Sequence, residues 1–309
     1  MIINRKSFLA IVSIIILGLI MINLPKFYAQ KTNLRIATTT SLDASGLLDK
    51  IKVEFEKRNP TISVTWIAVG TGQAIEIGKR GDADIILVHN RQFEDKFISE
   101  GYGVHGVTFA WNDFVLVGPK EDPAKVNSSN NVIEAFKRIY EAGEDGRALF
   151  ISRGDMSGTH LKEMEIWNHS GLNVDKKRWY IEIGQGMEQA LIIANERQGY
   201  TLSDRATYLS LKETAGFSLK ILFERDSRLL NLYRAIIVNP NRQHNVNYEC
   251  AQKFVQFLVS SEGQNIIGNY TKKGQILFYP AFGRLSEIGI NDSYEEDQVN
   301  YWRRILEGD

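Results

Sequence analysis

The sequence predicts an α/β protein: two α/β lobes with a ligand cleft between them, joined by two hinge strands. From Leu34 onward, short apolar runs alternate with amphipathic helical patterns, which is typical of α/β architecture. Two apolar strands end in similar turn signals, Gly118–Pro119 and Asn239–Pro240, and they enclose a second α/β series. A chain of 309 residues, 43% of them hydrophobic, is long enough to build two cores.

Three strand and helix pairs form the first series. Leu47, Ile51 and Phe55, for example, recur at helical spacing after the first strand. Consecutive units of this kind predict a parallel sheet with helices on both faces. The predicted strands are 34–37, 63–69 and 83–89, and the predicted helices are 45–59, 72–81 and 93–101.

A long apolar strand that ends at Gly118 interrupts this alternation, and a second series follows it. Its predicted strands are 148–152, 179–183 and 200–202, and its predicted helices are 160–171 and 187–198. The apolar strand 232–238 then leads to helices at 248–260 and 262–270 and to an irregular, acidic tail. We therefore expect one lobe to comprise 33–115 plus 238–309, and the other to comprise 116–237.

The N-terminus has the pattern of an export signal. Arg5 and Lys6 precede an apolar stretch from Phe8 to Ile22. The bulky Phe27 departs from the small-residue pattern expected before cleavage at Ala29, so an uncleaved membrane anchor remains an alternative. We expect residues 1–29 to be a signal peptide or anchor, and the protein to act in the periplasm or elsewhere outside the cytoplasm.

Charge and cysteine content exclude several functions. The chain has 37 basic and 37 acidic residues, so no basic surface for nucleic acid is expected. Its single cysteine, Cys250, lies on the predicted amphipathic helix 248–260 and is interpreted as a packed thiol. We expect no internal disulfide and no bound metal cation.

Three predicted strands end in loops rich in hydroxyls and glycine, and a helix follows each loop. These loops are 38–46 (TTTSLDASG), 70–74 (GTGQA) and 152–160 (SRGDMSGTH). Helix N-termini offer free N–H donors, glycine allows close approach, and Arg153 adds a fixed cation. The loops come from both predicted lobes. The sequence therefore predicts a cage of donors around a tetrahedral oxyanion.

Each loop also has a simpler interpretation. Ser and Thr before a helix commonly serve as N-caps, and Asp155 could pair with Arg153 at the surface. The 70–74 loop fails as a dinucleotide fingerprint because Ile75 occupies the place of the third glycine. Capping needs only one hydroxyl, whereas these loops supply several together with an arginine, and this conjunction favours anion binding.

Other chemistry has weaker support. The five histidines lack metal-ligand spacing, and most are expected at the surface or as caps. His160 and Glu163 could act together as a base on one helix face, although solvated helix charges are the simpler interpretation. No nucleophile elbow or P-loop lysine is present, and we expect no catalytic residues. The alternatives are an extracytoplasmic hydrolase or phosphatase that uses Ser157 beside His160, and a signalling domain of the same fold.

The ordered motifs of this chain resemble those of the tungstate-binding proteins of ABC-type importers, a branch of the periplasmic solute-binding proteins. The resemblance implies the two-lobed type II fold, closure around an oxyanion, and delivery to a membrane permease driven by a separate ATPase. It also implies a monomer without a cofactor. The motifs run from Leu34 to Pro280: ATTTS, GLLD, AVGTG, GDADIILVH, EGYG, NDFVLVGP, DPAKV, SRGDMSGTH, GQGM, YTLSDRATYL and IIVNP.

The resemblance also assigns the binding residues. The anion would be held by eight residues, which are Thr39, Thr40, Ser41 and Thr71 from the first lobe and Arg153, Ser157, Gly158 and Thr159 from the second. Gly186 and Met187 would add backbone donors. Ala206 and the missing lipid-anchor cysteine depart from the pattern of the family.

The identity of the anion stays open among tungstate, molybdate and phosphate. Residues 153–159 also match the R-x-D-x-S-G-T pattern of phosphate-binding proteins, in which an aspartate accepts the proton of hydrogen phosphate. If Asp155 points into the pocket, a protonated anion is favoured. If it is turned onto Arg153, a donor-only cage remains, which suits tungstate or molybdate.

Overall fold

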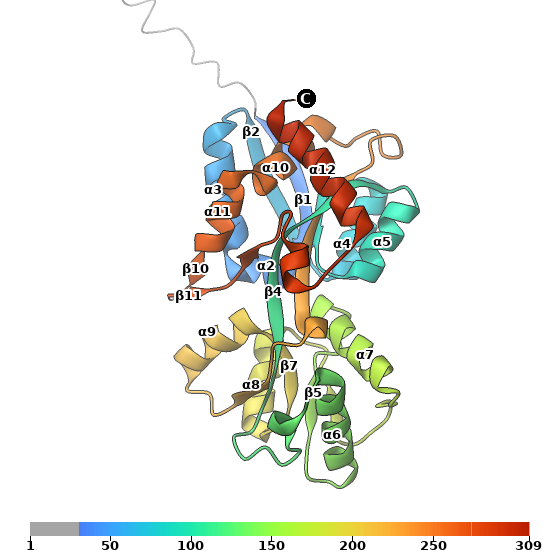
Figure 1. Cartoon of the computed structure of the whole chain (residues 1–309), viewed down its shortest axis with the longest axis vertical. Helices are drawn as coiled ribbons and strands as arrows, with labels where there is room; N and C mark the ends of the chain where they lie inside the picture. Colours follow the sequence, from blue (N-terminus) through green and yellow to red (C-terminus); the bar gives the residue numbers. More distant parts are fainter. Residues whose placement is uncertain (1–30, 273, 309) are drawn as a thin grey trace, which may run out of the picture.

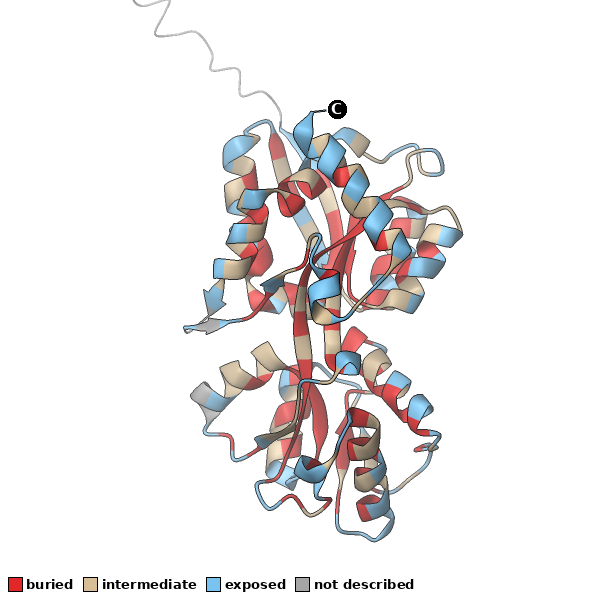
Figure 2. Cartoon of the chain, viewed as in Figure 1, coloured by how far each residue is buried: buried red, intermediate tan, exposed pale blue. Residues whose placement is uncertain are grey.

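The computed structural model describes residues 31–272 and 274–308, so the predicted signal or anchor segment 1–29 lies outside the described residues. Two lobes are stacked along the long axis (Figure 1). The strand β4 (Gly103–Gly118) runs through both lobes, and β9 (Leu230–Val238) pairs with its first part in lobe 1. Buried residues gather inside each lobe and along the two crossing strands (Figure 2). Within the described residues, no helix has the length and apolar character needed to cross a membrane.

Lobe 1 is built on a sheet with the strand order β12-β4-β9-β3-β1-β2, in which β12 is the short strand Tyr279–Pro280. The strands β1 (Thr32–Thr39), β2 (Ile62–Val69) and β3 (Ile85–Val88) are parallel, as predicted. In contrast, β9 is antiparallel to β3, and β4 is antiparallel to β9, so the whole sheet is mixed. One core packs Phe55, Phe254 and Leu258 on one face, and another packs Ile86, Phe97 and Ile236 on the other.

Helices cover both faces of this sheet. They are α2 (Thr40–Ser45), α3 (Leu47–Arg58), α4 (Thr71–Arg80), α5 (Arg91–Ser99), α10 (Tyr248–Val259) and α11 (Ser261–Asn269). The single helix predicted at 45–59 is in fact preceded by a separate turn of helix. Gly46, with φ of +80°, ends α2 in a left-handed conformation, and its N–H donates to the carbonyl of Asp43.

Lobe 2 is built around the second half of β4, which pairs with β7 (Thr201–Asp204) and β8 (Lys220–Phe223). The strand β5 (Phe150–Ser152) is parallel to β6 (Tyr180–Glu182). The surrounding helices are η1 (Val126–Ser128), α6 (Val132–Glu144), α7 (Gly158–Ser170), α8 (Met187–Arg197), α9 (Arg205–Ala215) and η2 (Ser227–Leu229). The sequence-based assignment did not include α6, β8 or α9.

The chain crosses between the lobes earlier than predicted. The β4–β9 ladder ends where Asp113 pairs with Leu230, and all of β9 after this point pairs within the sheet of lobe 1. Phe114 already belongs to a core of lobe 2, whereas Ile237 belongs to lobe 1. The return to lobe 1 is therefore at Leu230 and not at residue 238. An apolar strand buried on both faces has the same sequence pattern in either lobe, so the pattern alone could not place it.

The tail predicted to be irregular ends in a helix, α12 (Ser293–Glu307), which lies across lobe 1 (Figure 1). Asp292 caps this helix, and Trp302 is fully buried and donates from Nε1 to the carbonyl of His105 at 3.1 Å. The buried carboxylate of Glu295 faces Arg234 of β9. Short elements precede α12: β10 (Thr271–Lys272), β11 (Gln275–Ile276), β12 (Tyr279–Pro280) and η3 (Leu285–Ile288).

Candidate functional site

Three strands of lobe 1 end side by side, and each is followed by a predicted site residue or by a histidine. In the sheet register, Thr39 pairs with Val69 and Thr38 pairs with Leu87, so the carboxyl ends of β1, β2 and β3 adjoin. Ligands of open α/β sheets bind at this edge. Thr71 is the first residue of α4, directly after β2.

The loop of lobe 2 between β5 and α7 is curled by two residues with left-handed backbones. Gly154 has a φ of +62° and Met156 a φ of +56°. Ser157 then caps α7, and its Oγ accepts from the backbone N–H of His160 at 3.3 Å. The N-terminus of a helix of this length presents N–H donors and a partial positive charge.

The two lobes meet at His89, which follows β3. Its Nε2 lies 3.2 Å from Ser41 Oγ, and Ser41 Oγ lies 3.2 Å from Thr39 Oγ1. From lobe 2, Gly158 comes so close that a Cβ atom there would lie 2.1 Å from His89 Cε1. The 38–46 loop of lobe 1 and the 152–160 loop of lobe 2 therefore meet at His89. The 70–74 loop lies beside the second of these, because a Cβ atom added at Gly70 would be 3.9 Å from the carbonyl oxygen of Met156.

Buried polar atoms without partners mark this place. Thr71 Oγ1, His89 Nδ1 and Arg153 Nε are buried and have no hydrogen-bond partner among residues 31–272 and 274–308. Buried polar groups in folded proteins nearly always have partners. Arg153 Nε is a donor and the Thr71 hydroxyl can donate, so an acceptor such as an oxyanion would satisfy both.

Asp155 is turned onto Arg153 and the start of α7. Its Oδ2 pairs with Arg153 Nη2 at 2.5 Å, and its Oδ1 accepts from the backbone N–H of Ser157 at 3.1 Å. Burial opposes its charge, but the hydrogen bonds from Ser157 and the charge of Arg153 outweigh burial and lower the pKa of Asp155. The expected pair forms, but it is not a surface pair, since Arg153 is 5% exposed.

The other predicted residues differ in their surroundings. Thr159 is buried in the first turn of α7, next to Gly158. Thr40 is exposed at the start of α2, whereas Thr39 is buried and caps that helix. Gly186 is the N-cap of α8, and Met187 is its buried first residue. Seven of the eight predicted site residues are thus buried or half-buried.

The expectation that most histidines lie at the surface is wrong for His89 and His160, which are both buried. Burial, and then the charges of Arg153 and Lys162, lower the pKa of His89 to about 4, although Asn231 acts in the opposite direction. Sequence reasoning did not include His89 in the site. Its place directly after the fully buried strand β3 is the signal that could have found it.

His160 and Glu163 have separate hydrogen-bond partners, so they do not form the acid–base pair that the sequence left as an alternative. His160 Nδ1 accepts from the backbone N–H of Met156 at 3.0 Å. Glu163 Oε1 instead accepts from Tyr180 Oη at 2.6 Å and from Trp167 Nε1 at 3.3 Å. Glu163 is not solvated, because its position in α7 faces the core of lobe 2. Burial raises its pKa to about 8.

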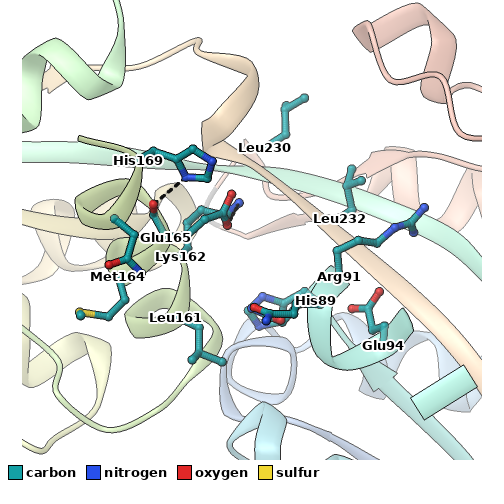
Figure 3. A pocket seen from close by; sticks show the side chains of 13 residues that line it. His89, Arg91, Glu94, Leu161, Lys162, Met164, Glu165, His169, Leu230 and Leu232 are labelled. Carbon is teal, nitrogen blue, oxygen red and sulfur yellow. Dashed lines mark hydrogen bonds and ion pairs between the residues drawn. The ribbon is translucent and has the colours of Figure 1, made fainter. Parts of the chain in front are cut away.

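A cleft of about 510 Å³ lies beside His89, between α5 and α7. In Figure 3, Leu161 and Lys162 of α7 and Arg91 and Glu94 of α5 lie around it, with His89 between them. Its lining in the described part of the chain includes none of the eight predicted site residues, and His89 is its link to the place where the loops meet. The described residues contain no group of three or more His, Cys, Asp or Glu side chains placed to hold a metal ion.

Comparison with known proteins places the chain in a family. Residues 28–262 match the model of a PBP superfamily domain. The chain is 42% identical over 254 residues to the tungstate-binding protein TupA of Peptoclostridium acidaminophilum, covering 81% of this chain and 86% of that protein. It is 36% identical over 240 residues to the TupA of Campylobacter jejuni, covering 77% and 87%. The chain belongs to the PBP superfamily and, within it, to the TupA family.

Solved structures agree with this assignment. The tungstate-binding protein TupA of Desulfovibrio alaskensis is 40% identical and aligns with a TM-score of 0.73, covering 81% of this chain and 99% of that one. The tungstate ABC transporter structure of Geobacter sulfurreducens is 44% identical with a TM-score of 0.67, covering 77% and 98%. The family resemblance read from the motifs of this TupA-family protein, and the type II two-lobed fold, are both confirmed.

Gly158→Ala is expected to lower the free energy of unfolding by about 1–3 kcal/mol, because the new methyl group would overlap the His89 ring. Adding His89→Ala should remove the overlap, so the double variant should lose less stability than the sum of the two single variants. Gly186→Ala is the matched control, because open space surrounds that glycine among the described residues. Denaturant unfolding of the wild type and the four variants measures these losses, and additive losses from Gly158→Ala and His89→Ala would contradict the contact.

Glu163→Gln is expected to flatten the dependence of stability on pH. The pKa of Glu163 is raised from 4.5 to about 8, so its contribution to stability is full below about pH 4.5 and is lost as pH rises through 8. The melting temperature of the wild type should therefore fall more steeply between about pH 5 and pH 8 than that of the variant. Glu165→Gln, at a more exposed position on the same helix, should behave as the wild type does. Equal slopes in all three proteins would contradict the assignment.

Proposed function

We propose that this TupA-family protein is the solute-binding component of an ABC importer, which captures tungstate and delivers it to a membrane permease. The observation that carries the proposal is the group of buried, unpartnered donors at the meeting of the lobes, with Asp155 turned onto Arg153. The names of the TupA relatives support tungstate as the anion.

The residues of both lobes would hold the anion by hydrogen bonds. Arg153 supplies a fixed positive charge, Thr71 supplies a hydroxyl, and the N-terminus of α7 supplies backbone N–H groups. The hinge at Asp113 and Leu230 would let the lobes close. Closure excludes water, which strengthens each hydrogen bond in the site.

The orientation of Asp155 favours a fully ionised anion over hydrogen phosphate. Both of its oxygens already accept, one from Arg153 and the other from Ser157. A hydroxyl group on the ligand would therefore compete with these bonds for its acceptor. Tungstate and molybdate are both fully ionised near neutral pH and similar in size, so this argument supports either.

The geometry gives little support to the hydrolase alternative. Ser157 Oγ accepts from the backbone N–H of His160 as a helix cap. His160 Nδ1 accepts from Met156, so the proton of the neutral ring lies on Nε2, and Nδ1 is not free to act as a base. This arrangement suits an anion site at the N-terminus of α7 better than an activated nucleophile.

We place the protein outside the cytoplasm, where residues 1–29 would export or tether it. The charged and then apolar order of the N-terminal sequence supports this location. A binding protein so placed presents its bound anion to a permease, and we expect it to act as a monomer.

Titration of the purified protein with tungstate, molybdate, sulfate and phosphate tests the function. Tungstate and molybdate are expected to bind more tightly than sulfate and phosphate. Tungstate should also raise the melting temperature, because a ligand of the native state stabilises it by about 2.7 kcal/mol at 100 times its Kd. Calorimetry gives the affinities. Tight phosphate binding without tungstate binding would show that phosphate is the ligand, and no binding of any of the four anions would refute the proposal.

Arg153→Ala is expected to weaken tungstate binding by about 1.5–3 kcal/mol, roughly 10- to 150-fold, because it removes a charged hydrogen-bond donor. Arg225→Ala is the matched control, since the Arg225 side chain lies in the same lobe and is 86% exposed. Its affinity should equal that of the wild type. Unchanged calorimetric affinity in Arg153→Ala would remove this arginine from the site.

A further inference from the structure

His89 lies where the two lobes and the hinge strand β9 meet, and the proposed function leaves its role unexplained. The ring contacts Ser41 from α2, Gly158 from α7, and Tyr233 from β9 at a centroid distance of 4.8 Å. It is 8% exposed. The inference below rests on the proposed oxyanion site.

The hydrogen bonds of Asn231 show which of its side-chain atoms is still free to interact with the His89 ring. Asn231 Nδ2 donates to Asn112 Oδ1 at 2.8 Å and to Tyr233 Oη at 3.0 Å, which uses both amide hydrogens. Asn231 is also a neighbour of His89, and its side chain opposes the lowering of the pKa of His89. Its Oδ1 and His89 Nδ1 are both without a geometric partner in the described residues. Oδ1 is the only polar atom of this side chain left without a partner in the described part of the chain, and it is an acceptor. We therefore assign the hydrogen of the neutral His89 ring to Nδ1, where Asn231 Oδ1 could accept it.

This tautomer controls the direction of two hydroxyl groups. In a neutral ring with hydrogen on Nδ1, Nε2 is an acceptor, so the hydroxyl of Ser41 donates to it. Thr39 Oγ1 accepts from the backbone N–H of Leu42, and its own hydrogen can point to Ser41 Oγ. Both hydroxyl hydrogens then stay within the protein. The lone pairs of Ser41 would face a bound anion, which is unfavourable.

We propose that His89 takes up one proton from the solvent when the oxyanion binds. With hydrogen on both ring nitrogens, Nδ1 donates to Asn231 Oδ1, and Nε2 donates to Ser41 Oγ. The hydroxyl hydrogen of Ser41 is released and turns to an oxygen of the anion. His89 is thus a positioning residue, which acts on the ligand through Ser41.

The charges around His89 account for the change of state. In the empty site, burial and the cations Arg153 and Lys162 of lobe 2 keep the ring neutral, with a pKa of about 4. On the side of β9, Tyr233 is uncharged, because burial and the charge of Asp204 raise its pKa. A dianion enclosed beside the ring adds two negative charges and raises the pKa of His89. Protons are then taken up at every pH between the free and bound values.

Proton uptake is measured by tungstate titration calorimetry of the full protein near pH 7, in buffers with different ionisation enthalpies. The wild type should take up close to one proton per anion, and its affinity should rise as pH falls, up to tenfold per pH unit. His89→Asn, which cannot be protonated, should bind more weakly and take up no proton. His160→Asn is the matched control, since His160 is also buried at the start of α7 and has a lowered pKa. It should retain the uptake.

A second variant tests the same step without removing the histidine. Asn231→Asp places a carboxylate beside the ring, which should keep His89 protonated in the empty protein and so reduce the uptake on binding. No uptake by the wild type, full uptake by His89→Asn, or uptake that is lost in His160→Asn would each overturn the proposal. Failure of the wild type to bind tungstate would instead refute the proposed function.

Discussion

The pairing of β4 with β9 is the constraint on which the rest of the molecule depends. Both strands belong to the sheet of lobe 1, and their ladder stops where Asp113 meets Leu230. Beyond that point, β4 continues as the central strand of lobe 2. The two sheets therefore share a strand, and this shared strand positions the strand ends of lobe 1 opposite the N-terminus of α7. Arg234 of β9, fully buried between Glu94 and Glu295, fastens the ladder to α5 and α12.

The site formed in this way holds buried donors that the protein itself leaves unpaired. An unsatisfied buried polar group costs about 1–3 kcal/mol, so an acceptor that enters the site recovers this free energy. Asp155 uses its acceptor capacity on Arg153 and Ser157, which in the proposed function would favour an anion without a hydroxyl group. His89 belongs to the same hydrogen-bond network, because in our proposal its protonation state sets the direction of the Ser41 hydroxyl.

Local signals predicted much of the fold and the hydroxyl-rich loops of the candidate site. Strands such as β1, β2 and β3 are recognisable because each is apolar and ends in a turn, and Thr71 and Ser157 are recognisable as hydroxyls at helix starts. The acidic residues of 292–296 concealed α12. Asp292 is its N-cap and Glu295 is buried against Arg234, which lies 61 residues earlier in the chain. A partner so distant in sequence leaves no local signal.

The sequence by itself determined the α/β class, the two series of strands and helices, and the three donor-rich loops, because apolar periodicity and helix capping depend on near neighbours in the chain. Tertiary structure alone decided where the chain crosses at Leu230 and that His89 lies against Gly158. These features depend on strand register and on contacts between segments tens of residues apart. Only the folded chain brings those segments within hydrogen-bonding distance.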